Sequence, residues 1–217
     1  MTHIITGVYG SGKTEFAVNL GLHLAPATIA DLDVVNPFFR SREKEAYLAK
    51  HQVNIAGSSI DHHVAQDIPA VSFSFLSAIR RQENVVIDLA GGPVGLRLLA
   101  SCYDDILPQA YQFLCVINPN RPETASPAQI IDFIHTINRE SKLPITGLVN
   151  NGHMLAHTTA QHILDAQKMI LEVSHTTSLP IAYTLVQADI HQQVKAQLAS
   201  QHTITFPKAH MREAWQH

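Results

Sequence analysis

Residues 7–14 read GVYGSGKT and match the pattern GxxxxGK[ST] without a substitution. In such a loop the glycines let the backbone curl, so that successive N–H groups point inward toward phosphate oxygens. Lys13 is expected to reach the β- and γ-phosphates, and the Thr14 hydroxyl is expected to ligate Mg²⁺. The sequence therefore predicts a Walker A loop that binds a nucleoside triphosphate through Gly7, Val8, Tyr9, Gly10, Ser11, Gly12, Lys13 and Thr14.

Acidic residues follow two other apolar runs. Val85-Val86-Ile87-Asp88 has the form of a Walker B element, in which Asp88 holds the Mg²⁺ shell. Gly91 and Gly92 come next and would let the following loop swing toward the γ-phosphate. Asp31 and Asp33 stand at i and i+2, so on an extended strand they project to the same side. We expect Asp33 to orient the attacking water or to join the metal shell, with Asp31 in support; a pair of solvated acids is the alternative interpretation.

A polar and aromatic run follows Asp33. Its Arg40 and Arg42 are candidates for contacts to the triphosphate, within their own subunit or across to a neighbouring one, although surface salt bridges explain them equally well. Asn36 lies in the same run and is a further candidate switch contact.

The run Asn150-Asn151-Gly152-His153 lies where many P-loop proteins read the base. Guanine selection normally needs an NKxD pattern, and His153 stands at the aspartate position. The sequence therefore favours ATP over GTP. Asn150 is the candidate base contact, or alternatively it caps the turn that follows.

The elements that must position these residues alternate along the chain. Strands are expected at residues 4–6, 28–30, 53–55, 85–87, 113–117, 145–149 and 181–184, and helices at 14–24, 42–50, 70–81, 95–102, 127–139, 159–174 and 190–200. Ser126 followed by Pro127 is a clear helix start. This alternation predicts an α/β fold of three layers, with a mostly parallel central sheet and helices on both faces.

Length and composition set further limits. The 217 residues suit one nucleotide-binding domain over 1–217, with about 205–217 as a C-terminal tail that has its own binding role. The net charge of −3 and the absence of a basic stripe argue against nucleic acid or an anionic membrane as a partner. No apolar run reaches the ~20 residues that a membrane span needs, so a cytoplasmic protein is expected. Cys102 and Cys115 lack metal-site spacing and are expected to be small buried hydrophobes.

With these motifs in place, the chain resembles the SIMIBI class of P-loop NTPases, which contains partition ATPases, nitrogenase iron protein and metal-insertion GTPases. More narrowly, GSGKTEFAVNL, DLDVVNPFFRSRE, ITGLVNN and the terminal MREAW are similar to bacterial ATP-binding proteins labelled cobyrinate-synthase/partition-type (CobQ/CobB/MinD/ParA) nucleotide-binding domains. The resemblance implies a P-loop fold with ATP and Mg²⁺ as ligands. Partition ATPases carry a lysine at the position of Val8, so a homodimer here would need Arg40 or Arg42 to supply charge across the interface.

The function expected from these features is a Mg-dependent, slow ATPase that acts as a nucleotide switch for an unidentified protein client. Water would attack the γ-phosphate in line, while Lys13 and Mg²⁺ take up the developing charge. An ATP-dependent small-molecule kinase or synthetase is an alternative, and so is a binding module without turnover. The chain's 14 histidines and its resemblance to metal-insertion proteins leave a metallochaperone-like GTPase as a further alternative.

Overall fold

The computed structural model describes residues 1–32, 44–57, 75–91, 93–206 and 209–211. Five of the predicted site residues, Asp33, Asn36, Arg40, Arg42 and Gly92, lie outside these ranges.

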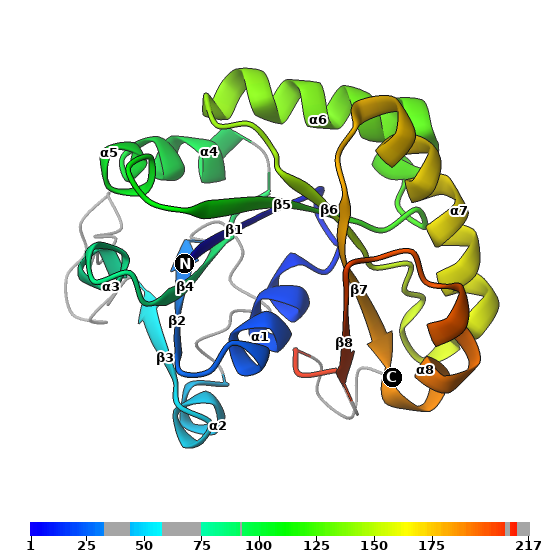
Figure 1. Cartoon of the computed structure of the whole chain (residues 1–217), viewed down its shortest axis with the longest axis horizontal. Coiled ribbons are helices and arrows are strands. Elements are labelled where there is room, and N and C mark those ends of the chain that lie inside the picture. Colours follow the sequence, from blue (N-terminus) through cyan, green and yellow to red (C-terminus); the bar gives the residue numbers. More distant parts are fainter. Residues whose placement is uncertain (33–43, 58–74, 92, 207–208, 212–217) are drawn as a thin grey trace, which may run out of the picture.

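A single parallel sheet of eight strands forms the centre of the described chain, in the order β3-β2-β4-β1-β5-β6-β7-β8 (Figure 1). The strands are β1 Thr2–Thr6, β2 Ala27–Leu32, β3 Val53–Gly57, β4 Asn84–Leu89, β5 Tyr111–Ile117, β6 Gly147–Asn150, β7 Ile181–Gln187 and β8 His202–Phe206. All seven predicted strands are confirmed, and every neighbouring pair is parallel.

Helices connect the strands and cover both faces of the sheet. They are α1 Lys13–His23, α2 Glu45–Lys50, α3 Phe75–Arg80, α4 Pro93–Ala100, α5 Tyr103–Ile106, α6 Pro127–Ser141, α7 Ala160–Thr177 and α8 Ala188–Val194, with short 3₁₀ turns at Pro122–Thr124, Leu155–His157 and Lys195–Gln197. The predicted start of α6 is confirmed: the Ser126 hydroxyl accepts the Gln129 N–H, and Pro127 is the first helical residue.

Two apolar layers hold most of the helices to the sheet, and a smaller cluster joins α8 to α7 and β7. Alternate residues of each strand enter opposite layers, so Ile4 belongs to the layer with residues of α3, α4, α6 and α7, whereas Ile5 belongs to the layer with residues of α1 and α2. Helices α4 and α6 accordingly lie on one side of the sheet and α1 and α2 on the other (Figure 1). Cys102 and Cys115 are buried among the apolar residues, as predicted. Burial raises the pKa of the Cys115 thiol to about 12, so it stays protonated at neutral pH.

Three parts of the described chain differ from the sequence-based expectation. β8 was not predicted, because this edge strand alternates apolar with polar residues and buries only Ile204 and Phe206 fully. The four-residue helix α5 was not predicted either. The helix expected over 190–200 ends at Val194 and continues as a 3₁₀ turn. Among the described helices, none is both long enough and apolar enough to cross a lipid bilayer.

Candidate functional site

The predicted phosphate loop joins the end of β1 to the start of α1, in the middle of the sheet. β1 lies between β4 and β5, and the connections that follow β1 and β5 run to opposite faces, through α1 and α6. Two neighbouring parallel strands whose connections diverge leave a crevice at their carboxyl ends, which is where ligands bind in open α/β sheets. The topology therefore places the glycine-rich loop at this crevice.

The loop has the backbone conformation that its glycines permit. Gly10 and Gly12 have φ values of 71° and 89°, in the left-handed region that side chains disfavour. A side chain on Gly12 would also collide with the amide of Asn151. Lys13 is largely buried, and its Nζ donates a hydrogen bond to the Val8 carbonyl oxygen at 3.1 Å, so the ammonium group folds back over the loop.

Ser11 is fully buried, and its Oγ has no hydrogen-bond partner within the described part of the chain. A buried hydroxyl without a partner is costly, so this atom has hydrogen-bonding capacity that a ligand would satisfy. Thr14 follows Lys13 on the first turn of α1 and is partly exposed.

The two acids at the strand ends lie side by side. Asp31 on β2 pairs in register with Asp88 on β4, and each residue is 1% exposed. Val86 belongs to the apolar layer under α1, and Asp88 two residues later points to the same side. Ile29 belongs to the same layer, so Asp31, two residues later on β2, also points to this side. Both carboxylates therefore face the layer of α1, whose first turn carries Lys13 and Thr14.

Gly91 brings the loop after β4 against the phosphate loop. A Cβ atom on this residue would lie 3.5 Å from Lys13 Nζ and 3.7 Å from the Tyr9 backbone nitrogen. The structure thus brings the predicted residues Gly91 and Lys13 together, and Asp88 lies near the end of β4, the strand that leads to Gly91.

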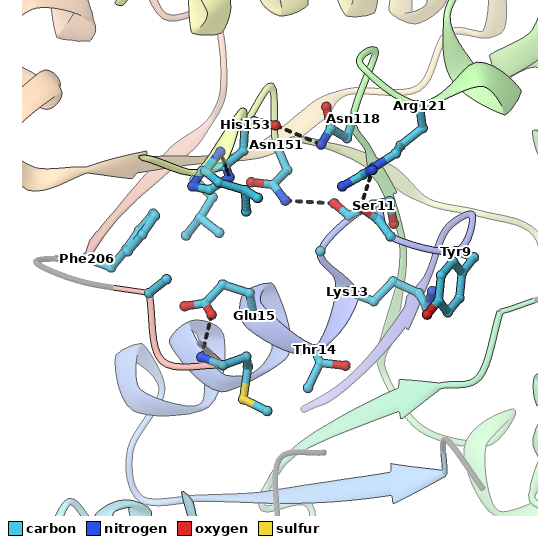
Figure 2. A pocket seen from close by; sticks show the side chains of 16 residues that line it. Tyr9, Ser11, Lys13, Thr14, Glu15, Asn118, Arg121, Asn151, His153 and Phe206 are labelled. Carbon is cyan, nitrogen blue, oxygen red and sulfur yellow. Dashed lines mark hydrogen bonds between the residues drawn. The ribbon is translucent and has the colours of Figure 1, made fainter. Parts of the chain in front are cut away.

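A cavity of about 290 Å³ opens beside the loop (Figure 2). Residues 9–14 form one end, Asn118, Arg121 and Asn151 lie beside them, and Glu15 lies between this end and Phe206 (Figure 2). The other end is mostly apolar and consists of His153, Leu155, Leu185, Phe206, Ala209 and Met211. Asp31 and Asp88 do not line this cavity.

Polar side chains from the loops after β5 and β6 brace the phosphate loop. Asn151 Nδ2 donates to the Ser11 carbonyl at 2.7 Å, and Arg121 Nε donates to the Gly10 carbonyl at 2.8 Å (Figure 2). Asn118 Nδ2 donates to the His153 carbonyl at 3.0 Å and joins the two loops to each other. These three side chains were not predicted as site residues, because no local motif distinguishes them and only the tertiary contacts bring them to the loop.

The predicted base contact, Asn150, is placed away from the cavity. It is fully buried; its Nδ2 donates to the Ile163 carbonyl and to Gln167 Oε1, and its Oδ1 accepts the Gly152 N–H at 3.1 Å. The side chain thus closes the following turn, which was the alternative interpretation of its role. Asn151 lines the cavity in its place.

The apolar end contains residues from three separate segments. The His153 ring lies 6.2 Å from the Phe206 ring, and His153 Nδ1 accepts the Leu155 N–H at 2.9 Å. Met211 is 7% exposed and packs in the layer under α1. The flat ring and aliphatic side chains at this end suit an apolar, planar group.

No protein-family model and no curated protein matches this sequence. Solved structures do match in fold. Cell division protein FtsY from Thermotoga maritima superimposes with a TM-score of 0.54 at 16% identity, over 85% of this chain and 60% of that one. FtsY from Mycoplasma mycoides matches with a TM-score of 0.54 at 16% identity, over 83% of this chain and 58% of that one. This chain therefore spans less than two thirds of these structures. The likeness shows that it has an α/β P-loop NTPase-like fold.

Proposed function

We propose that this chain binds Mg·ATP in the cavity and hydrolyses it slowly, and that the bound nucleotide acts as a switch for a protein client. The observation that carries the proposal is the division of the cavity into two ends. The glycine-rich loop with Lys13 suits a triphosphate, and the mostly apolar end with His153 and Phe206 suits a base. The P-loop NTPase-like fold supports nucleotide binding at this position.

At the phosphate end, backbone N–H groups of the loop and the N-terminus of α1 would bind the phosphate oxygens. The Lys13 ammonium, which now bonds the Val8 carbonyl, would transfer to the β- and γ-phosphates. Ser11 Oγ would gain a partner in the same step. The backbone of the loop is in place before the ligand arrives, so only the Lys13 side chain has to move, which limits the entropy lost on binding.

The residues near Lys13 fit a magnesium ion. Thr14 supplies a hydroxyl oxygen and Asp88 supplies carboxylate oxygens, the hard donors that Mg²⁺ prefers. When bound, the ion would neutralise charge on the β- and γ-phosphate oxygens. In hydrolysis a bond forms between water oxygen and the γ-phosphorus while the bond to the bridging oxygen breaks, giving ADP and phosphate. Lys13 would stabilise the charge that develops, and Asp33, outside the described residues, remains our prediction for orienting the water.

The cavity favours adenine over guanine. Guanine is read by a carboxylate that accepts its N1–H and 2-amino protons. Among the described residues that line the cavity, Glu15 alone has a carboxylate, and both its oxygens already accept backbone N–H groups. A guanine base would therefore find no carboxylate in this lining that lacks hydrogen-bond donors, so we expect it to bind less tightly than adenine.

Calorimetric titration with non-hydrolysable ATP and GTP analogues in Mg²⁺ tests the binding part. We expect the ATP analogue to bind more tightly and Lys13→Ala to lose binding. Lys168→Ala, on the exposed side of α7, is the matched control and should bind as the wild type does. Tighter binding of the GTP analogue would reject the base assignment and favour the GTPase alternative, and binding of neither would reject the whole proposal.

Phosphate release measured on Asp88→Asn tests the hydrolytic part. The variant should keep binding the ATP analogue but lose turnover, because the Asp88 carboxylate would hold the Mg²⁺ ion and would not contact the adenine. A wild type without turnover would indicate a pure binding module. Formation of ADP only with an added small-molecule acceptor, with or without release of phosphate, would indicate a kinase or synthetase. We propose in addition that the chain is related to cobyrinate-synthase/partition-type domains, that it acts on a protein client and that it forms a homodimer.

A further inference from the structure

Glu15, the residue after Thr14, holds a segment almost two hundred residues away. Its Oε1 accepts the backbone N–H of His210 at 2.9 Å, and its Oε2 accepts the N–H of Met211 at 2.9 Å. Asn19 Nδ2 donates to Oε1 at 2.8 Å and to the Glu15 carbonyl at 2.8 Å, and so fixes the carboxylate on α1. Hydrogen bonds to an ionised group are shorter and stronger than neutral ones, and two parallel ones also fix orientation.

The segment held in this way forms part of the cavity wall. Ala209 and Met211 line the mostly apolar end together with Phe206 (Figure 2 labels Phe206 and Glu15). Residues 209–211 have neither helical nor strand structure, so no regular ladder of backbone bonds fixes them. Glu15, the packing of Met211 against the layer that contains Phe16, and a ring contact of His210 with Tyr47 at 5.4 Å hold them in position.

Both ends of the cavity therefore depend on one turn of α1. Lys13 and Thr14 face the phosphate end, and the next residue positions the opposite wall. The Glu15 carboxylate accepts hydrogen bonds from the wall and from Asn19. As an anion and an acceptor it cannot bind the phosphates, so its contribution is to hold the wall. Loss of this carboxylate would release the wall but leave the glycine-rich loop unchanged.

We propose that Glu15 is a positioning residue for nucleoside recognition: it holds residues 209–211 as the wall of a purine nucleoside compartment. This inference rests on the proposed nucleotide binding. It assigns a role to the C-terminal segment that differs from phosphate binding, and it ties base affinity to hydrogen bonds made within the protein.

The test compares a ligand that has a nucleoside with one that does not. Binding of a non-hydrolysable ATP analogue and of inorganic tripolyphosphate, both with Mg²⁺, is measured for the wild type, Glu15→Gln and Met211→Ala. Glu15→Gln loses the charge and one of the two acceptors while keeping the shape of the side chain. Glu172→Gln, an exposed position on α7, is the matched control for the chemical change.

We expect Glu15→Gln to weaken binding of the ATP analogue by roughly tenfold and to leave tripolyphosphate binding within about twofold of the wild type. Met211→Ala should show the same selective loss, and the double variant should lose less than the product of the two single losses, because both act through one wall. Met211→Ala also keeps the proposal testable if Glu15→Gln does not fold.

Equal weakening of both ligands by Glu15→Gln would overturn the proposal, since it would place Glu15 at the phosphate end. Unchanged binding of the ATP analogue in both single variants would overturn it as well. A wild type that binds neither ligand would reject the proposed function itself, and this inference with it. A wild type that binds tripolyphosphate as tightly as the ATP analogue would keep the phosphate site and reject the nucleoside compartment.

Discussion

Asn150 and Asn151 are neighbours in the chain, yet their side chains serve different parts of the molecule. At the end of a strand, successive side chains point to opposite faces. Asn150 is therefore directed to α7, where it meets Gln167, and Asn151 is directed to the phosphate loop, where it meets the Ser11 carbonyl. The two residues therefore allow a direct comparison of an asparagine that stabilises the fold with one that lines the cavity.

We predict that Asn150→Ala and Asn151→Ala separate stability from binding. Asn150→Ala should lower the free energy of unfolding by about 1–3 kcal/mol, because it leaves buried partners unpaired. Asn151→Ala should weaken binding of the ATP analogue by roughly tenfold, because the loop loses its brace. Chemical denaturation and calorimetric titration of both variants check this. A larger loss of binding in Asn150→Ala would contradict the assignment.

His3 makes stability depend on pH. Burial lowers its pKa to about 4, and the positive charge of the N-terminus contributes in the same direction. The folded protein thus prefers neutral His3, whereas the unfolded chain takes up a proton near pH 6.5. The unfolded state binds more protons between these values, so stability falls as the pH drops from about 6.5 to about 4.

We predict that His3→Gln loses this part of the pH dependence. The free energy of unfolding of the wild type should fall, relative to that of the variant, by up to about 3 kcal/mol between pH 7 and pH 4. Urea denaturation of both proteins at several pH values measures the difference. A difference that stays constant with pH would show that His3 does not titrate as its burial implies.

Among the elements, α7 supports the loop that carries Asn151 and His153. It begins with a capping box in which Thr159 Oγ1 accepts the His162 N–H at 3.3 Å, and His162 Nδ1 accepts the Thr159 N–H at 3.2 Å. The two bonds satisfy N–H groups that the first turn of a helix leaves without partners. The cap thus fixes where the loop ends and the helix begins.

We predict that Thr159→Ala lowers the free energy of unfolding by about 1 kcal/mol, as expected for loss of an N-cap. Thr176→Ala near the other end of α7 should change it by less, because Thr176 is exposed and only bonds the Glu172 carbonyl. Thermal or urea denaturation compares the two variants. Equal effects would mean that the cap contributes no more than an ordinary surface threonine.

For the whole molecule, ligand binding and folding are linked. The cavity exists only when β1, β5, β6, β8 and residues 209–211 are assembled, so the unfolded chain has no equivalent site. A ligand that binds only the folded state stabilises it, and at a hundred times its dissociation constant the gain is about 2.7 kcal/mol.

We therefore predict that the ATP analogue with Mg²⁺ raises the melting temperature of the wild type, whereas Lys13→Ala melts at the same temperature with and without it. Thermal unfolding followed by circular dichroism measures both. A shift in Lys13→Ala as large as that of the wild type would place the ligand away from the glycine-rich loop.

The sequence by itself determined the features that depend on local pattern. The spacing of Gly7, Gly12 and Lys13 was enough to predict the phosphate loop, and buried parallel strands appear as continuous apolar runs, which is why seven strands were predicted. Asp88 was predicted in the same way, from an acidic residue directly after an apolar strand. The single nucleotide-binding domain over 1–217 remains a prediction of this kind.

The tertiary structure decided what depends on contacts between distant segments. It selected Asn151 over Asn150, brought Arg121 to Gly10, and placed Met211 against Glu15. Local periodicity carries no information on such pairs, because the sequence around each residue does not depend on which distant residue it contacts. The edge strand β8 and the C-terminal wall belong here too: they are half polar, and their role exists only through the cavity that they close.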